Sequence, residues 1–354
     1  MGLRDRLRGL MGFIRRTKRE VRQATREPVD HVILLDGTMS TLDEGDETNV
    51  GLIYKLLDEV SASRPVALLY EAGNQWEDWS KTLDIIEGRG INRQIRRCYG
   101  WLASRYREGD RVFLIGYSRG AYAVRSLVGV IDQIGLLKPE HATERAIRDV
   151  YRLYQTGANQ TASTEFADAY CHADVPIEVV GVFDTVKSLG FRAPFVWKWE
   201  EVKHSFHNHH LSSIVKHGYH ALALDETREA YTPVLWECHD GFKGRVEQVW
   251  FRGSHGDIGG QLSGFHDARP LSNIPLVWML EKLAACSLPL PDGWRARFPM
   301  DADGPSCGSW RGWGKYFLAR KKRVVGSDPS ESLHPSALGR SRRAVKVGLE
   351  VRTG

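Results

Sequence analysis

The sequence predicts an α/β protein whose mostly parallel sheet is flanked by helices, and three observations lead to this fold class. Short apolar runs alternate with segments of helical periodicity along most of the chain. The runs are apolar throughout, as expected of strands buried on both faces of a parallel sheet. A polar residue follows each run, where the active sites of such sheets lie.

The predicted elements follow one another in a regular order. Apolar runs predict strands over 31–38, 66–73, 112–115, 177–185 and 246–260. Helical periodicity predicts helices over 48–60, 91–106, 121–134, 144–156 and 273–285, with Thr48 as a capping residue of the first. Strands separated by helices imply a parallel sheet that is covered on both faces.

Composition indicates a globular protein with a large core. The chain has 354 residues, of which 42% are hydrophobic and 26% charged, so one large α/β domain is as compatible with its length as two domains. The five cysteines are scattered and form no C-x-x-C pair, which excludes a recognisable disulfide framework or zinc knuckle.

The ends of the chain are basic and the middle is acidic. Residues 1–30 carry a net charge of +5 and residues 315–354 a net charge of +7, so residues 31–314 carry −7. Leu3, Leu7, Leu10 and Ile14 recur at helical spacing among arginines, which predicts a basic amphipathic arm over residues 1–27. Such an arm fits peripheral contact with an anionic membrane, or packing on its own domain. Residues 343–354 form a second basic tail in this division of the chain.

Residues 116–120 read GYSRG and place a serine where the apolar run 112–115 meets a helix. A G-x-S-x-G strand-to-helix turn is the nucleophile elbow, which presents the serine hydroxyl above the sheet. The glycines let the strand and the helix approach closely. Ser118 is therefore the candidate nucleophile.

Two further strands end in residues that complete such chemistry. Asp184 lies near the end of the run 177–185, and His255 lies near the end of the run 246–260. The order Ser118, Asp184, His255 is that of the α/β-hydrolases. His255 is expected to accept the Ser118 proton while Asp184 orients the imidazole. Asp257 is the alternative acid, which in this order requires a later histidine, either His266 or His334.

An oxyanion hole requires two backbone N–H groups. Arg119, the residue after the nucleophile, supplies the first. Gly37 or Thr38, after the first strand, is the candidate for the second, unless Asp36 and Gly37 form an ordinary turn that Asp36 caps.

Residues 189–236 interrupt the alternation of strands and helices and are rich in aromatic residues and histidine, so a lid-like insertion is predicted there. The histidines at 204, 207, 209 and 210 lack a matching set of carboxylates or cysteines, so neither a metal nor a cofactor is expected.

Six blocks of the chain resemble the DUF2235 family of α/β-hydrolase-like proteins, which contains the catalytic domain of Tle1-type phospholipase effectors of type VI secretion. They are LLDGT at 34–38, GYSRGAYAVRSLVGVIDQIGLL at 116–137, VVGVFDTVKSLG at 179–190, YHALALDETREAYTPVLW at 219–236, VWFRGSHGDIGGQ at 249–261 and SLHPSALGR at 332–340. The segment after the second strand, YEAGNQWEDW, and the continuation of HGDIGG depart from the family pattern.

The resemblance implies an α/β-hydrolase-like domain over residues 28–342 and a serine hydrolase of acyl esters, with phospholipids as the leading substrates. Its catalytic residues carry over to Ser118, Asp184 and His255. It also implies either a cytoplasmic or membrane-peripheral protein or an effector secreted without a signal peptide. A catalytically degenerate hydrolase fold that serves as a binding or scaffold protein is the alternative. No nucleic-acid partner is expected, because no reader motif accompanies the basic ends.

Overall fold

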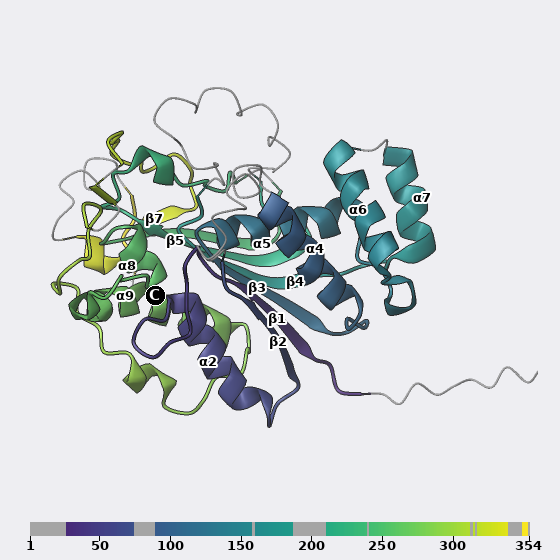
Figure 1. Ribbon diagram of the computed structural model, residues 1–354, viewed down its shortest axis with the longest axis horizontal. Helices are drawn as coiled ribbons and strands as arrows, with labels where there is room; N and C mark the ends of the chain where they lie inside the picture. Colours follow the sequence, from purple (N-terminus) through teal and green to yellow (C-terminus); the bar gives the residue numbers. More distant parts are fainter. Residues whose placement is uncertain are drawn as a thin grey trace, which may run out of the picture.

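A parallel sheet of seven strands with helices on both faces organises the chain (Figure 1). The computed structural model describes residues 26–73, 89–157, 160–186, 210–238, 241–311, 314–315, 317–338 and 349–352. The strand order is β2-β1-β3-β4-β5-β6-β7, and every neighbouring pair is parallel. The strands are β1 Asp30–Leu35, β2 Val66–Glu71, β3 Arg111–Tyr117, β4 Ile177–Phe183, β5 Val215–Ala223, β6 Arg245–Phe251 and β7 Glu331–Leu333. The predicted α/β fold class is confirmed.

The helices divide between the two faces of the sheet (Figure 1). One face carries α4 Arg89–Ala103, α5 Arg119–Ile134, α6 Glu144–Thr156 and α7 Gln160–Tyr170, and the other carries α2 Asn49–Ser61, the short α8 His255–Gly259 and α9 Arg269–Ala285. Successive side chains of a strand point to opposite faces. Ile33 and Leu35 accordingly belong to the first core, and Val32 and Leu34 to the second.

The strand order reverses beside β1. The chain passes from β1 to β2 on one side and then to β3 on the other, so the carboxyl ends of β1 and β3 flank a topological switch point. Ligands of open parallel sheets bind at such a point, because the connections leave it in opposite directions. The segment that follows β1 and the elbow that follows β3 both lie there.

Three elements differ from their predicted form. The predicted strand 246–260 ends at Phe251, and His255–Gly259 form helix α8 after a loop. Residues 215–223 are β5, an interior strand of the sheet, so only part of the predicted insertion 189–236 lies between strands. Residues 189–209 of this insertion fall outside the described residues. Leu333 of β7 pairs with residues 350–352, which places part of the predicted basic tail beside the sheet edge.

The predicted membrane-binding arm falls mostly outside the described residues. Its last two residues are described, and Arg26 pairs with the buried Asp110 at 2.5 Å. Asp110 also accepts hydrogen bonds from Val29 N and His31 Nε2, which fixes the start of β1. Over the ranges that the structure describes, no helix has both the length and the apolar character needed to cross a bilayer.

Candidate active site

Ser118 lies at a sharp turn between β3 and α5. Its backbone has φ 58° and ψ −119°, a region that costs a non-glycine residue energy and recurs at functional sites. A Cβ on Gly116 would lie 2.7 Å from Ala121, and one on Gly120 would lie 2.1 Å from Leu35 O. The two glycines therefore allow β1, β3 and the start of α5 to approach as closely as they do.

His255 bridges Ser118 and Asp184. Its Nε2 lies 2.9 Å from Ser118 Oγ and its Nδ1 lies 2.6 Å from Asp184 Oδ2. An ionised carboxylate only accepts hydrogen bonds, so Nδ1 carries the proton and Nε2 accepts from the serine hydroxyl. All three residues are buried, and Ser118, the most accessible, is 8% exposed. The structure thus brings together the three residues that the sequence order selects.

Asp184 is held by more than the histidine. It directly follows β4 with φ 41°, and its Oδ1 accepts from Ala223 N at 3.0 Å. The Arg323 guanidinium binds both carboxylate oxygens, with Nη2 at 2.8 Å from Oδ2. Burial alone would raise the pKa of Asp184, but the charge of Arg323 and the bonds from His255 and Arg323 hold it well below its usual range. Asp184 is therefore an anion at neutral pH.

Arg323 is the residue at this site that sequence reasoning missed. It lies 139 residues after Asp184 in the run RKKR, which has the appearance of a solvated basic stretch. Its side chain is nevertheless only 3% exposed, and its Nη2 also donates to Tyr231 O at 2.7 Å. No sequence pattern distinguishes Arg323 from its exposed neighbours.

Aromatic and acidic groups surround the imidazole of His255. Its ring centroid lies 4.9 Å from that of Tyr117 and 4.7 Å from that of Tyr231. Burial lowers the pKa of His255, and the hydrogen bond and charge of Asp184 oppose this only in part. The neutral imidazole, which is the form that accepts a proton, is therefore favoured.

Glu226 fixes the backbone of His255. Its Oε2 accepts from His255 N at 3.1 Å, and its carboxylate is paired with Arg228 at 2.7 Å. Burial alone would raise the pKa of Glu226, but the hydrogen bonds and charge of Arg228 lower it to about 2. Glu226 and Arg228 thus form a permanently ionised pair beside the histidine.

The candidate oxyanion donors lie at the start of α5 and after β1. Arg119 is the first residue of α5, where backbone N–H groups have no acceptor within the helix. Gly37 N donates to Asp36 Oδ1 at 2.7 Å, which leaves Thr38 N as the stronger candidate of the two. Gly37 O, in the same peptide as Thr38 N, accepts from Gly73 N at 3.1 Å, and Gln261 Nε2 donates to Thr38 O at 2.7 Å. The close approach of Gly120 to Leu35 and Asp36 brings the two segments together.

Asp257 is turned away from the imidazole contact that the alternative assignment requires. Its carboxylate accepts four hydrogen bonds, which come from Ser254 N and Oγ, Ser306 Oγ and Cys307 N. It therefore caps α8 and fastens the 306–307 loop. Of the two later histidines, His266 is exposed and His334 Nδ1 accepts from Ser336 N.

No cluster of three metal-ligating side chains occurs in the part of the chain that the structure describes. His204, His207 and His209 of the histidine-rich stretch lie outside that part, and His210 contacts Glu237. The described site presents an acid, a base and a hydroxyl in contact, which is the arrangement that acyl transfer through a serine requires.

Comparison with known proteins places this geometry in context. Residues 30–282 match the family model described as "T6SS, Phospholipase effector Tle1-like, catalytic domain". The uncharacterised Saccharomyces cerevisiae protein YEL023C is 23% identical over 223 residues, which cover 56% of this chain and 31% of that protein. The chain thus spans about a third of the length of this curated relative.

Two solved structures are also similar to the chain. An uncharacterised Pseudomonas aeruginosa protein has a TM-score of 0.46 and 16% identity, over 77% of this chain and 49% of that one. The structure titled as the Tle1 effector bound to the VgrG spike has a TM-score of 0.34 and 17% identity, over 66% of this chain and 51% of that one. The match to the family model covers well over half of the chain, and the protein therefore belongs to the family of Tle1-like phospholipase effector catalytic domains of the type VI secretion system.

Proposed function

We propose that the chain is a serine ester hydrolase that cleaves an acyl ester of a phospholipid. The observation that carries this proposal is the pair of contacts made by one imidazole, to Ser118 Oγ at 2.9 Å and to Asp184 Oδ2 at 2.6 Å. The family description supplies the substrate class, since it names a phospholipase effector. A neutral histidine in contact with a serine hydroxyl is the arrangement that activates this weak nucleophile.

The reaction proceeds in two balanced steps. Ser118 Oγ attacks the ester carbonyl carbon while its proton moves to His255 Nε2, and the carbonyl oxygen becomes an oxyanion that receives hydrogen bonds from Arg119 N and Thr38 N. Collapse breaks the ester C–O bond, and the leaving alcohol takes the proton from His255. Water then repeats the sequence on the acyl-enzyme, releasing the fatty acid and restoring the Ser118 hydroxyl.

The buried environment supports this assignment of roles. Asp184 is ionised and stabilises the imidazolium that forms during each step. The site lies at the switch point beside β1, where the segment after β1 reaches the elbow. We further propose that the protein acts as a secreted effector on lipid, as the family description suggests, and that residues 1–27 contribute peripheral membrane contact.

The test is incubation of the purified chain with a panel of phospholipids and p-nitrophenyl esters, with products identified by mass spectrometry. We expect release of fatty acid and lysophospholipid, and loss of both on Ser118→Ala. Phospholipid cleaved at a phosphodiester bond, or equal release by the variant, would contradict the proposal. Complete inactivity of the wild-type chain toward every ester would instead favour the degenerate binding fold.

A further inference from the structure

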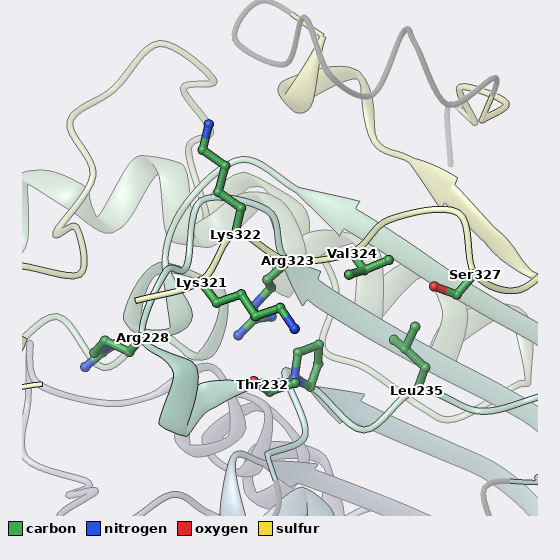
Figure 2. A pocket seen from close by; sticks show the side chains of 9 residues that line it. Arg228, Thr232, Leu235, Lys321, Lys322, Arg323, Val324 and Ser327 are labelled. Atoms are coloured by element: carbon green, nitrogen blue, oxygen red, sulfur yellow. The ribbon is translucent and has the colours of Figure 1, made fainter. Parts of the chain in front are cut away.

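A cavity of about 210 Å³ lies beside the acid of the candidate triad (Figure 2). Its walls come from two segments and are formed by Arg228, Thr232, Pro233, Leu235, Lys321, Lys322, Arg323, Val324 and Ser327. Arg323 binds Asp184, and the residue before Thr232 is Tyr231, whose ring packs against His255. The cavity therefore shares a wall with the catalytic groups.

The charged groups that line this cavity are all cationic. Arg228 is neutralised by Glu226, and Arg323 by Asp184. Lys321 and Lys322 are exposed and have no ion-pair partner within the described ranges. Figure 2 shows the Arg323 side chain turned into the cavity and the Lys322 side chain extending away from Thr232. Uncompensated positive charge with hydroxyl groups nearby suits an anion that has several oxygens.

Residues 317–324, here called the basic segment, are fixed beside the triad. Ala319 O accepts from Glu229 N at 3.0 Å, and Lys321 N donates to Thr227 O at 2.7 Å. Arg320 Nε donates to Phe317 O at 2.8 Å, and Arg323 is paired with Asp184. Two arginines of the segment thus serve the fold, while the two lysines between them remain available.

The basic segment and Trp310, which contacts it, expose apolar side chains. Leu318 is 83% exposed and Val324 is 61% exposed, and Trp310, 63% exposed, is stacked on the guanidinium of Arg320 at 3.7 Å. Single exposed apolar residues are ordinary, but these three lie together with unpaired lysines and close to Asp184 and His255. Apolar side chains that enter the lipid and lysines that meet phosphates are the features by which proteins bind a membrane interface.

We propose that the basic segment and its cavity form a phospholipid-binding surface, in which the cavity receives the phosphate of one headgroup. Lys321 faces that phosphate, Lys322 contacts neighbouring anionic headgroups, and Leu318 and Val324 enter the acyl region. Identification of the bound lipid as substrate rests on the proposed hydrolase function. The proposal that this surface binds a membrane is independent of the hydrolase function, because none of its lysines acts on the ester.

The test measures binding of the full chain to vesicles in the Ser118→Ala background, so that turnover does not alter the lipid. Vesicles of phosphatidylcholine are compared with vesicles that also contain phosphatidylglycerol. We expect Lys321→Gln/Lys322→Gln to weaken binding to the anionic vesicles by about tenfold or more, since each lysine near such a surface contributes substantially. Leu318→Ser should weaken binding to both kinds of vesicle.

The matched control is Lys243→Gln. Lys243 is an exposed lysine in the loop before β6, at the amino end of that strand, whereas Asp184 lies at the carboxyl end of β4, so loss of Lys243 should leave vesicle binding unchanged. Unchanged binding of the double variant, or an equal loss in the control, would overturn the proposal. A second result would also overturn the proposal: inorganic phosphate inhibits cleavage of a soluble ester while the double variant still binds vesicles. The cavity would then be a site for a free anion. Lysine-dependent binding by a chain that cleaves no ester would refute only the hydrolase function.

Discussion

Replacement of Arg323 by methionine tests how the charge of Asp184, the proposed acid of the triad, is controlled. The change removes the cation from Asp184 but keeps an unbranched apolar side chain in place of the arginine's aliphatic part, while Ala223 N and His255 still donate to the carboxylate. We expect the pKa of His255 to rise, because a positive charge near the imidazole disfavours the imidazolium. Since the neutral imidazole of His255 is the proposed base, the acidic limb of the kcat/KM profile should move to higher pH.

The size of this shift follows from the geometry. Arg323 Nη2 and His255 Nδ1 bond the same Oδ2 at 2.8 Å and 2.6 Å, so the two nitrogens are at most 5.4 Å apart. At an effective dielectric constant of about 20, unit charges at that separation interact by about 3 kcal/mol, or about two pKa units. The guanidinium charge is spread over several atoms, so we expect a shift of about one to two units.

The assay is the pH dependence of kcat/KM on a soluble short-chain ester. Arg323→Lys is the matched control, because it keeps the charge but lacks the forked geometry. Its acidic limb should stay near that of the wild type while its turnover falls. Urea unfolding should show a loss of about 3–5 kcal/mol for the methionine variant, as expected when one partner of a buried ion pair is removed. An acidic limb that is unmoved or shifted to lower pH in Arg323→Met would refute this reasoning.

Four further substitutions give distinct outcomes. Asp184→Asn should reduce turnover by about 10⁴ with the fold retained. Asp257→Asn should mainly reduce the free energy of unfolding, because it weakens the cap of α8. The reverse ranking of the two variants in kinetics and urea unfolding would identify Asp257 as the acid. Burial raises the pKa of Asp36 to about 6 in the folded protein, against about 4 unfolded, so its contribution to stability is present below pH 4 and is lost as pH rises through 6. Unfolding of Asp36→Asn followed at a series of pH values should therefore lack this decline, and an unchanged profile would exclude Asp36 as its source. Gly120→Ala places a Cβ 2.1 Å from Leu35 O and should destabilise the protein by about 1–3 kcal/mol or more; a variant as stable as wild type in urea would contradict the close approach of β1 and α5.

The sequence predicted the elements whose apolar period was clear. The runs of β1, β3 and β4 are recognisable because a strand buried on both faces is largely apolar. β2 is the edge strand and only half-buried, but its residues VALLY still form an unbroken apolar run. β5 was hidden because VKHGYHALA begins with charged and histidine residues and follows a histidine-rich stretch. Helix α8 was read as strand because it has five residues, too few to show a helical period.

Site residues were predictable only where the neighbouring sequence indicates the local backbone structure. Ser118 stands between glycines at a strand end, and Asp184 and His255 follow apolar runs. Arg323 has no such context, since its partner is 139 residues away and its neighbours are exposed lysines. The hydrogen bond from Gly37 N to the Asp36 carboxylate was not predictable either, because it depends on side-chain direction, which residue spacing does not determine.

The most direct measurement of the proposed chemistry is labelling of the full chain by a fluorophosphonate probe, which reacts with an activated serine. The wild-type protein should be labelled at a single peptide containing Ser118, with loss of phospholipid hydrolysis in step with labelling. Ser118→Ala should be neither labelled nor active, with turnover reduced by about 10³ or more. Equal labelling of both proteins, or hydrolysis that survives the substitution, would show that the contact between Ser118 and His255 is not the catalytic one.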